Sequence, residues 1–282
     1  MITGTGLISQ PTSVVLAGCG NMGFAMLRGW LATGTLKPQD VHVVEPLDAL
    51  LLRADGQGVN TYSTAAALPD DLMPDIVIFA VKPQVIGDVI GDYLRFSQPG
   101  RATTFVSVAA GVPIARFERE LAPGAPVIRV MPNTPAAVGE GAMVMCANAH
   151  VTDRQRKTVE RLMAASGEVT EIGDEALMDA VTAVSGSGPA YVFHLIEALT
   201  EAGKAVGLPD DIAGRLALQT VHGAARYAHQ SGEDPGTLRE QVTSPNGTTA
   251  AALGVLMRPD GLAALLQEAV RAARDRAIEL GR

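Results

Sequence analysis

Two short segments carry the residue types that could do chemistry. The first is "GCGNMG", residues 18–23, which follows an apolar β-branched run and precedes apolar residues at helical spacing. At the junction of a strand and a helix, Gly18 permits a tight turn, Gly20 lets a pyrophosphate approach the backbone, and Gly23 lets helix and strand pack closely. The N–H groups that begin the helix would then face the phosphates. This segment predicts dinucleotide binding, with a plain glycine-rich turn as the alternative.

The second segment is "SPNGTT", residues 244–249, a tight turn inside an otherwise helical stretch. Ser, Thr, Asn and Gly are the usual residues at the start of a helix, and most such clusters do nothing else. A turn that leads into a helix also offers unpaired N–H groups, here from Gly247, Thr248 and Thr249, and the positive end of a helix dipole. Such a turn would bind a carboxylate without needing an arginine.

Glu45 carries a further signal, because it lies 22 residues beyond Gly23 at the end of the apolar run 41–45. Dinucleotide-binding folds place an acid near this position to bond the adenosine ribose. A carboxylate there would repel a 2′-phosphate, so Glu45 taken alone favours NADH over NADPH. An exposed loop acid ahead of Pro46 is the alternative, and Arg53 could still reach a phosphate.

The elements that must position these residues are strands alternating with helices. We expect strands at 13–18, 41–45, 75–81, 103–109 and 127–131, each pair separated by enough residues for a crossover. This pattern predicts a Rossmann-type, doubly wound parallel sheet with helices on both faces.

Three loops follow the later strands, at the edge where open α/β sheets bind ligands: "AVKPQ" (80–84), "SVAAGV" (107–112) and "MPNTPAAVGEGA" (131–142). Lys82 either faces a phosphate or ribose or is a solvated cation. Asn133, between two prolines, is placed to bond a planar group such as a carboxamide. The predicted cofactor contacts are Gly18, Gly20, Asn21, Met22, Gly23, Glu45, Ala80, Val81, Lys82, Pro83, Ala109, Gly111 and Asn133.

Beyond about residue 170 the periodicity is helical throughout, with Gly and Pro between the helices. We therefore expect a loose tail at 1–12, a dinucleotide-binding domain at 13–170 and an all-α domain at 171–282. The helices carry apolar residues on more than one face, which predicts a large helical dimer interface. "SGSGPAY" (185–191) breaks one helix and starts the next.

Composition narrows the function classes. The 282 residues are enough for two cores, and a net charge of −8 argues against a nucleic-acid partner. No apolar run reaches the ~18 residues of a membrane span, and the N-terminus lacks the pattern of a secretory signal, so we expect the cytoplasm. Cys19 and Cys146 cannot form a disulfide framework, and the five histidines share no ligand spacing, so no metal is expected.

Six segments in order, "GCGNMG", "AVKPQ", "SVAAG", "RVMPNTPAAVGEG", "AVSGSGPAYVF" and "VTSPNGTTAAAL", make the chain similar to the pyrroline-5-carboxylate reductases. The resemblance covers nearly the whole chain. It implies an N-terminal Rossmann domain, a C-terminal dimerisation domain, NADPH or NADH as cofactor, and a homo-oligomer whose active site is shared between chains. The implied reaction is hydride transfer to the C=N bond of Δ1-pyrroline-5-carboxylate, which makes L-proline.

In that family the corresponding turn holds the substrate, and the threonine that matches Thr249 lies near the ring nitrogen. The resemblance therefore assigns substrate binding to Ser244, Asn246, Gly247, Thr248 and Thr249, with Thr249 as the catalytic residue. Asn246 stands where the family usually has glycine. Since Asn tolerates positive φ better than any residue except glycine, we expect the turn to form.

Two other functions remain open. A β-hydroxyacid dehydrogenase shares the plan of a Rossmann domain followed by helices and would need a lysine base on a helix; Lys204 is the only lysine beyond residue 170. A non-catalytic protein that senses NAD(P)H would use the same fold, and fold alone does not settle function.

Overall fold

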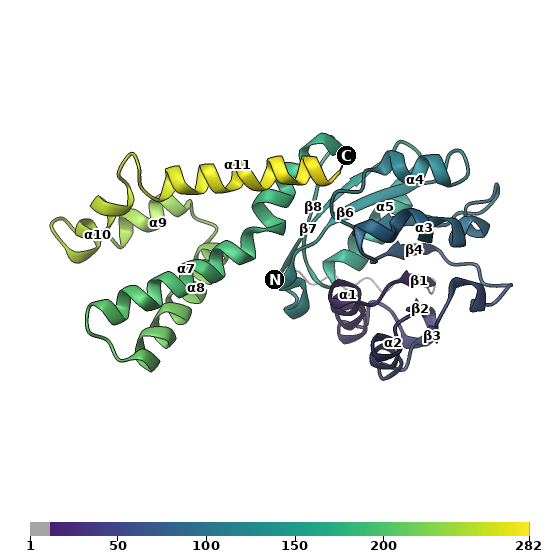
Figure 1. Ribbon diagram of the computed structural model, residues 1–282, viewed down its shortest axis with the longest axis horizontal. Helices are drawn as coiled ribbons and strands as arrows, with labels where there is room; N and C mark the ends of the chain where they lie inside the picture. The colour runs from purple at the N-terminus through teal and green to yellow at the C-terminus, as the bar shows by residue number, and fades with distance from the viewer. Residues whose placement is uncertain (1–11, 282) are drawn as a thin grey trace. The chain divides into compact units, whose positions relative to one another are not determined.

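The computed structural model of the protein describes residues 12–281 (Figure 1). The predicted tail at 1–12 lies outside the described residues except for Thr12, which is buried. Residues 187–273 form one compact unit, and the remaining described residues form the other. The domain boundary expected at 170 stays a prediction.

The larger unit is built on a sheet whose strands lie in the order β3-β2-β1-β4-β5-β6-β7-β8. Neighbouring strands are parallel except β6 and β7. The order reverses beside β1, which makes the β1–β4 crevice the switch point where such sheets bind ligands. The predicted Rossmann-type class is thus confirmed. The strands are β1 (Val14–Ala17), β2 (Val41–Val44), β3 (Asn60–Tyr62), β4 (Ile76–Phe79), β5 (Thr104–Ser107), β6 (Val127–Met131), β7 (Gly141–Ala147) and β8 (Gly167–Glu171).

All five predicted strands are present, as β1, β2, β4, β5 and β6, while β3, β7 and β8 were not expected. β3 is only three residues long, and β8 at the far edge is mostly exposed, so neither has a strong apolar pattern. β7 does alternate buried and half-buried residues over most of its length. Its residues are all small or apolar, and this continuous run was the signal that could have revealed it.

The central strands bury both faces, so alternate residues enter two different cores. Val14 and Leu16 of β1 join the core covered by α1 (Asn21–Ala32), α2 (Asp48–Asp55) and α5 (Asp153–Ala164). Val15 and Ala17 join the core covered by α3 (Ile86–Ile90) and α4 (Ile114–Glu120). Both faces of the sheet are therefore covered.

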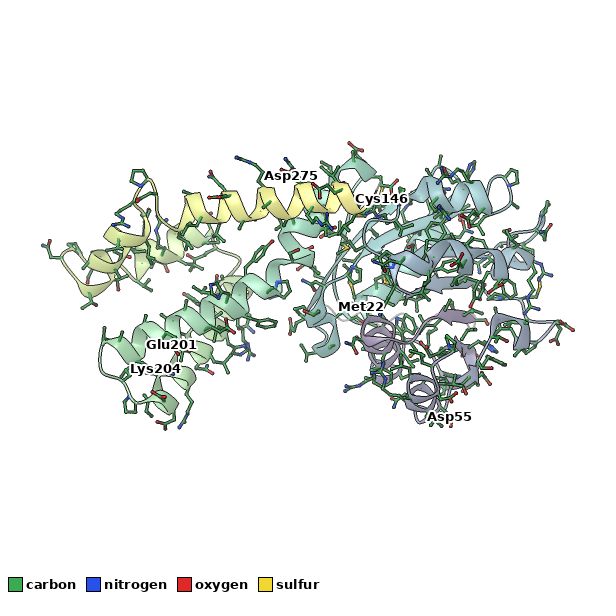
Figure 2. The ribbon with its side chains drawn as sticks, viewed as in Figure 1. Met22, Asp55, Cys146, Glu201, Lys204 and Asp275 are labelled. Carbon is green, nitrogen blue, oxygen red and sulfur yellow. The ribbon has the colours of Figure 1, made fainter. Side chains whose placement is uncertain are left out.

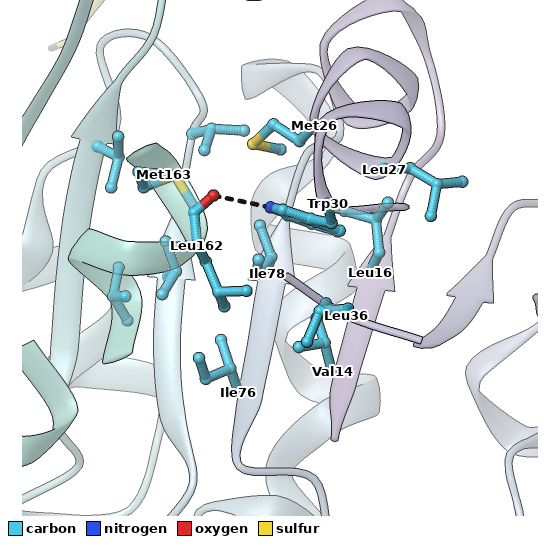
Figure 3. Close-up of a cluster of buried hydrophobic side chains, with 14 of the residues drawn as sticks. Val14, Leu16, Met26, Leu27, Trp30, Leu36, Ile76, Ile78, Leu162 and Met163 are labelled. Atoms are coloured by element: carbon cyan, nitrogen blue, oxygen red, sulfur yellow. Dashed lines mark hydrogen bonds between the residues drawn. The ribbon is translucent and has the colours of Figure 1, made fainter. Parts of the chain in front are cut away.

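Trp30 ties the helix that follows the glycine segment to a distant part of the chain. Its ring is fully buried, and its Nε1–H donates to the carbonyl oxygen of Leu162 in α5 at 2.9 Å (Figure 3). A buried indole N–H needs such a partner, because an unpaired donor in a core costs free energy. The bond therefore fixes α1 against α5 on one face of the sheet.

The C-terminal part is helical, as predicted, and no strand occurs among the described residues after Glu171. α6 (Met178–Val181) and a π-helical turn (Thr182–Gly186) precede the smaller unit. The helices that follow are α7 (Gly188–Ala205), α8 (Asp210–Ser231), α9 (Pro235–Gln241), α10 (Thr248–Leu256) and α11 (Leu262–Leu280). None of the helices in the described part of the chain is long and apolar enough to cross a membrane.

Many apolar side chains of these helices are uncovered. Phe193 is 59% exposed, Leu216 51% and Leu265 62%, and neither α7 nor α10 has a single buried residue. Monomeric proteins rarely expose so much apolar surface on one set of helices. The expected helical association surface is therefore present.

Trp30→Phe should lower the free energy of unfolding by about 2 kcal/mol, because it removes a buried hydrogen bond and leaves part of the indole volume empty. Urea unfolding measures the change. Leu52→Ala, at a side chain that is 69% exposed, is the control and should stay within about 0.5 kcal/mol of the parent protein. A Trp30→Phe variant as stable as this control would contradict the role given to the bond.

Candidate functional site

The glycine segment forms a sharp elbow between β1 and α1. Gly18 has φ 90°, and a Cβ there would lie 2.8 Å from a methyl carbon of Val81 and 2.9 Å from the carbonyl oxygen of Ala80. A Cβ on Gly23 would lie 2.4 Å from the carbonyl oxygen of Gly18. Gly18 therefore requires glycine for both conformation and space, and Gly23 requires it for space.

Gly20 differs, because a Cβ there would have no described atom within 4 Å. It is the N-cap residue of α1 and has no side chain to cap the helix, whose first turn contains Met22 (Figure 2). Uncapped N–H groups and the helix dipole together favour an anion at this point. The elbow thus fits the pyrophosphate of a dinucleotide.

The backbone of the elbow is hydrogen-bonded by two side chains, those of Glu45 and Arg53. Glu45 is 5% exposed as a residue; its Oε2 accepts from the N–H of Cys19 at 2.8 Å and its Oε1 from the N–H of Leu47 at 3.0 Å. Arg53 Nη2 donates to the carbonyl oxygens of Cys19, at 2.6 Å, and Gly20, at 3.1 Å. Glu45 is therefore not the exposed loop acid of the alternative interpretation.

The thiol of Cys19 lies at the centre of this arrangement. Burial raises its pKa to about 11, while the charge of Arg53 lowers the pKa and that of Glu45 raises it by smaller amounts. A thiol with such a pKa is mostly protonated near neutral pH, which disfavours Cys19 as a nucleophile.

The loops after β4 and β5 reach the same edge of the sheet. The N–H of Ala80 bonds the carbonyl oxygen of Ala17 at 2.8 Å, which brings Ala80, Val81 and Lys82 beside the elbow. Lys82 is exposed and forms no ion pair with any described residue. Ala109 is buried, and Gly111 has φ 75°.

A cavity of about 520 Å³ opens beside these loops. Pro83 and Gly111 line it, together with Arg116 of α4 and residues near the end of α11. Two of the predicted cofactor positions thus border an open space at the binding edge of the sheet.

Asn133 has both ends of its amide bonded to backbone. Its Nδ2 donates to the carbonyl oxygen of Ser185 at 3.0 Å, and its Oδ1 accepts from the N–H of Ala142 at 2.9 Å. In an α-helix the carbonyl of residue 185 would accept from the N–H of residue 189, but Pro189 has no N–H. Asn133 supplies the donor that Pro189 lacks, and its contact with a carboxamide stays a prediction.

The "SPNGTT" turn belongs to the unit of residues 187–273. Asn246 adopts φ 58° and is the one non-glycine residue with positive φ among the described residues, so the expected substitution for glycine is accommodated. A Cβ on Gly247 would lie 2.4 Å from the Ser244 hydroxyl oxygen, which explains the glycine there. Ser244 makes no hydrogen bond that caps α10.

One expectation about this turn was wrong. The N–H of Gly247 is not unpaired, because it closes the turn on the carbonyl oxygen of Ser244 at 3.1 Å. The N–H groups of Thr248 and Thr249, in the first turn of α10, bond no described residue. Nor does the hydroxyl of Thr249, unlike those of Thr182 and Thr200, which bond the carbonyl four residues earlier. The donors that remain available are therefore those of Thr248 and Thr249.

Lys204, the lysine required by a dehydrogenase of the rival type, pairs with two carboxylates. Its Nζ lies 2.9 Å from Glu201 Oε1 and 3.6 Å from Asp210 Oδ2 (Figure 2). The hydrogen bond to Glu201 raises the pKa of Lys204. Since a general base needs a lowered pKa, this environment disfavours that role. The described residues also contain no cluster of three or more His, Cys, Asp or Glu that could hold a metal.

Comparison with known proteins covers both regions of the chain. Residues 175–280 match a family model described as pyrroline-5-carboxylate reductase dimerisation, and residues 13–111 match one described as NADP oxidoreductase, coenzyme F420-dependent. The pyrroline-5-carboxylate reductase of Pseudomonas aeruginosa is 40% identical over 269 residues, which are 95% of this chain and 96% of that protein. That of Arabidopsis thaliana is 41% identical over 269 residues, 94% of this chain and 95% of the relative.

Solved structures of the same family are also similar to this chain. The pyrroline-5-carboxylate reductase of Coxiella burnetii has a TM-score of 0.90 and 34% identity, covering 97% of this chain and 100% of that one. The Plasmodium falciparum enzyme, solved with NADP bound, has a TM-score of 0.81 and 29% identity, covering 96% of this chain and 98% of the other.

Gly23→Ala should weaken the binding of NADH and NADPH at least ~10-fold, because the added methyl group collides with Gly18 and forces α1 away from the elbow. Fluorescence titration of the reduced nicotinamide measures the Kd. Gly91→Ala is the matched control, since a Cβ there meets no described atom within 4 Å and φ is −54°. Equal Kd values for the two variants would contradict the packing role of Gly23.

Proposed function

The chain belongs to the pyrroline-5-carboxylate reductase family, and we propose that it reduces the C=N bond of Δ1-pyrroline-5-carboxylate to give L-proline. A reduced nicotinamide dinucleotide, when bound, supplies the hydride. The observation that carries the proposal is the start of α10, where the N–H groups of Thr248 and Thr249 and the Thr249 hydroxyl have no partner among the described residues.

The substrate has two polar features, a carboxylate and a ring nitrogen. We assign the carboxylate to the N–H groups of Thr248 and Thr249, because uncapped donors at the positive end of a helix dipole bind anions. We assign the ring nitrogen to the Thr249 hydroxyl, which is half-buried and bonds no backbone carbonyl. Gly247 has a steric role, because a side chain there would collide with the Ser244 hydroxyl.

The proposed reaction requires little acid–base catalysis by the protein. A protonated imine is already electrophilic, so the chain has to orient it, hold its nitrogen and exclude water. This agrees with the raised pKa of the Cys19 thiol in the elbow and with the pairing of Lys204 with carboxylates.

The elbow and the α10 turn lie in different units, and the helices around the turn form a dimerisation domain. We propose that the chain is a homo-oligomer and that each active site combines the cofactor edge of one chain with the α10 turn of another. The uncovered apolar side chains of α7, α8 and α11 support this proposal, since a partner chain would bury them.

The direct test is oxidation of NADH or NADPH by the purified protein with Δ1-pyrroline-5-carboxylate, followed by absorbance of the reduced nicotinamide. We expect substrate-dependent oxidation of at least one cofactor and formation of proline. If neither cofactor is oxidised, the proposed function is wrong.

Thr249→Ala should lower kcat/KM at least ~10-fold, since it removes a hydrogen bond to the reacting group worth about 1.4 kcal/mol. Thr249→Ser keeps the hydroxyl and should retain most of the activity. Thr158→Ala, which removes a hydroxyl bonded to the Arg154 carbonyl on α5, is the matched control and should have no effect. An unchanged kcat/KM in Thr249→Ala would remove this residue from the mechanism.

A further inference from the structure

The end of β2 carries a fixed negative charge at the place where the adenosine half of a dinucleotide binds. Glu45 is held by two backbone N–H groups, from Cys19 in the elbow and Leu47 in the next loop. Each carboxylate oxygen has two acceptor sites, so each retains one after these bonds. The carboxylate is thus oriented beside the elbow and can still accept two hydrogen bonds.

The nearest cation already bonds the elbow through one of its terminal nitrogens. Arg53 Nη2 is occupied by the carbonyl oxygens of Cys19 and Gly20, and the guanidinium lies 4.1 Å from the ring centre of Phe24. Moving Arg53 towards a ligand would break both bonds and leave two carbonyl oxygens of the elbow without this donor. Arg53 therefore serves the elbow.

The loop after Glu45 offers no replacement. Residues 46–49 are Pro, Leu, Asp and Ala, and the side chains of Leu47 and Asp48 are exposed. A 2′-phosphate would approach the Glu45 carboxylate, and this loop has no lysine or arginine to pair with it. A ribose with free 2′- and 3′-hydroxyls would instead donate to the open acceptor sites of Glu45.

We propose that Glu45 selects the cofactor, and that this chain binds NADH in preference to NADPH. The inference rests on the proposed function only for the use of a nicotinamide dinucleotide. Members of the same fold family do accept the phosphate, since the Plasmodium falciparum enzyme was solved with NADP bound. The proposed preference for NADH therefore arises from Glu45, the residue that follows β2 in this chain.

Binding of the adenosine halves alone tests the proposal without any turnover. Calorimetry with 5′-ADP and 2′,5′-ADP should show at least ~10-fold tighter binding of 5′-ADP, and fluorescence titration should show the same order for NADH and NADPH. Equal affinities, or tighter binding of the 2′-phosphorylated ligands, would overturn the proposal. Loss of reductase activity with the binding preference intact would instead count against the proposed function.

One variant and one control locate the effect. Glu45→Gln removes the charge at nearly constant shape and should reduce the preference to within about 3-fold. Asp48→Asn removes the same formal charge from an exposed neighbour and should leave the preference unchanged. If Glu45→Gln keeps the full preference, or Asp48→Asn abolishes it, Glu45 is not the selecting residue.

Leu47→Arg keeps the test decisive if Glu45→Gln fails to fold, because it leaves the Glu45 carboxylate and the Leu47 N–H in place. The added cation, at a side chain that is 62% exposed, should tighten 2′,5′-ADP at least ~5-fold and leave 5′-ADP within about 2-fold. No selective gain for 2′,5′-ADP would show that the 2′ position does not face this loop, which would overturn the proposal.

Discussion

The structure depends on the geometry of one elbow, at Cys19 and Gly20, whose peptide groups are bonded by an acid and a base. The Glu45 carboxylate accepts a hydrogen bond from the Cys19 N–H, and Arg53 donates to the carbonyl oxygens of Cys19 and Gly20. The contact of Gly23 with the Gly18 carbonyl then leaves a single direction for α1. The direction of α1 fixes where its first N–H groups lie. Since these groups would bind the phosphates of the cofactor, the positions of the ribose and the nicotinamide would depend on the same direction.

Residue patterns predicted the parts of this fold in which local and tertiary preferences agree. The buried β-branched runs became β1, β2, β4, β5 and β6, and the glycine spacing placed the elbow between β1 and α1. β3 and β8 were missed because a short or exposed edge strand has little apolar pattern, and because edge strands are held by backbone pairing to a neighbour. β7 was missed although its residues form a continuous apolar run.

The site was predictable in its backbone and much less in its side-chain partners. Positive φ at Asn246 followed from residue type, and so did the need for glycine at Gly18 and Gly23. The hydrogen-bond partners of Glu45 and Asn133 could not be predicted, because they are distant in the sequence. Cys19 lies 26 residues from Glu45, and Ser185 lies 52 residues from Asn133. The unpaired N–H of Gly247 was a wrong expectation for a local reason, since the turn uses that donor to close itself.

The uncovered side chains of α7, α8 and α11 also bear on how the polypeptide acquires its structure. The sheet can complete both of its cores from one chain, whereas Phe193, Leu216 and Leu265 have no core of their own to enter. Stability of such helices is linked to protein concentration by mass action. If a second chain covers these side chains, the helical region completes its packing in a bimolecular step, which follows the synthesis of both chains.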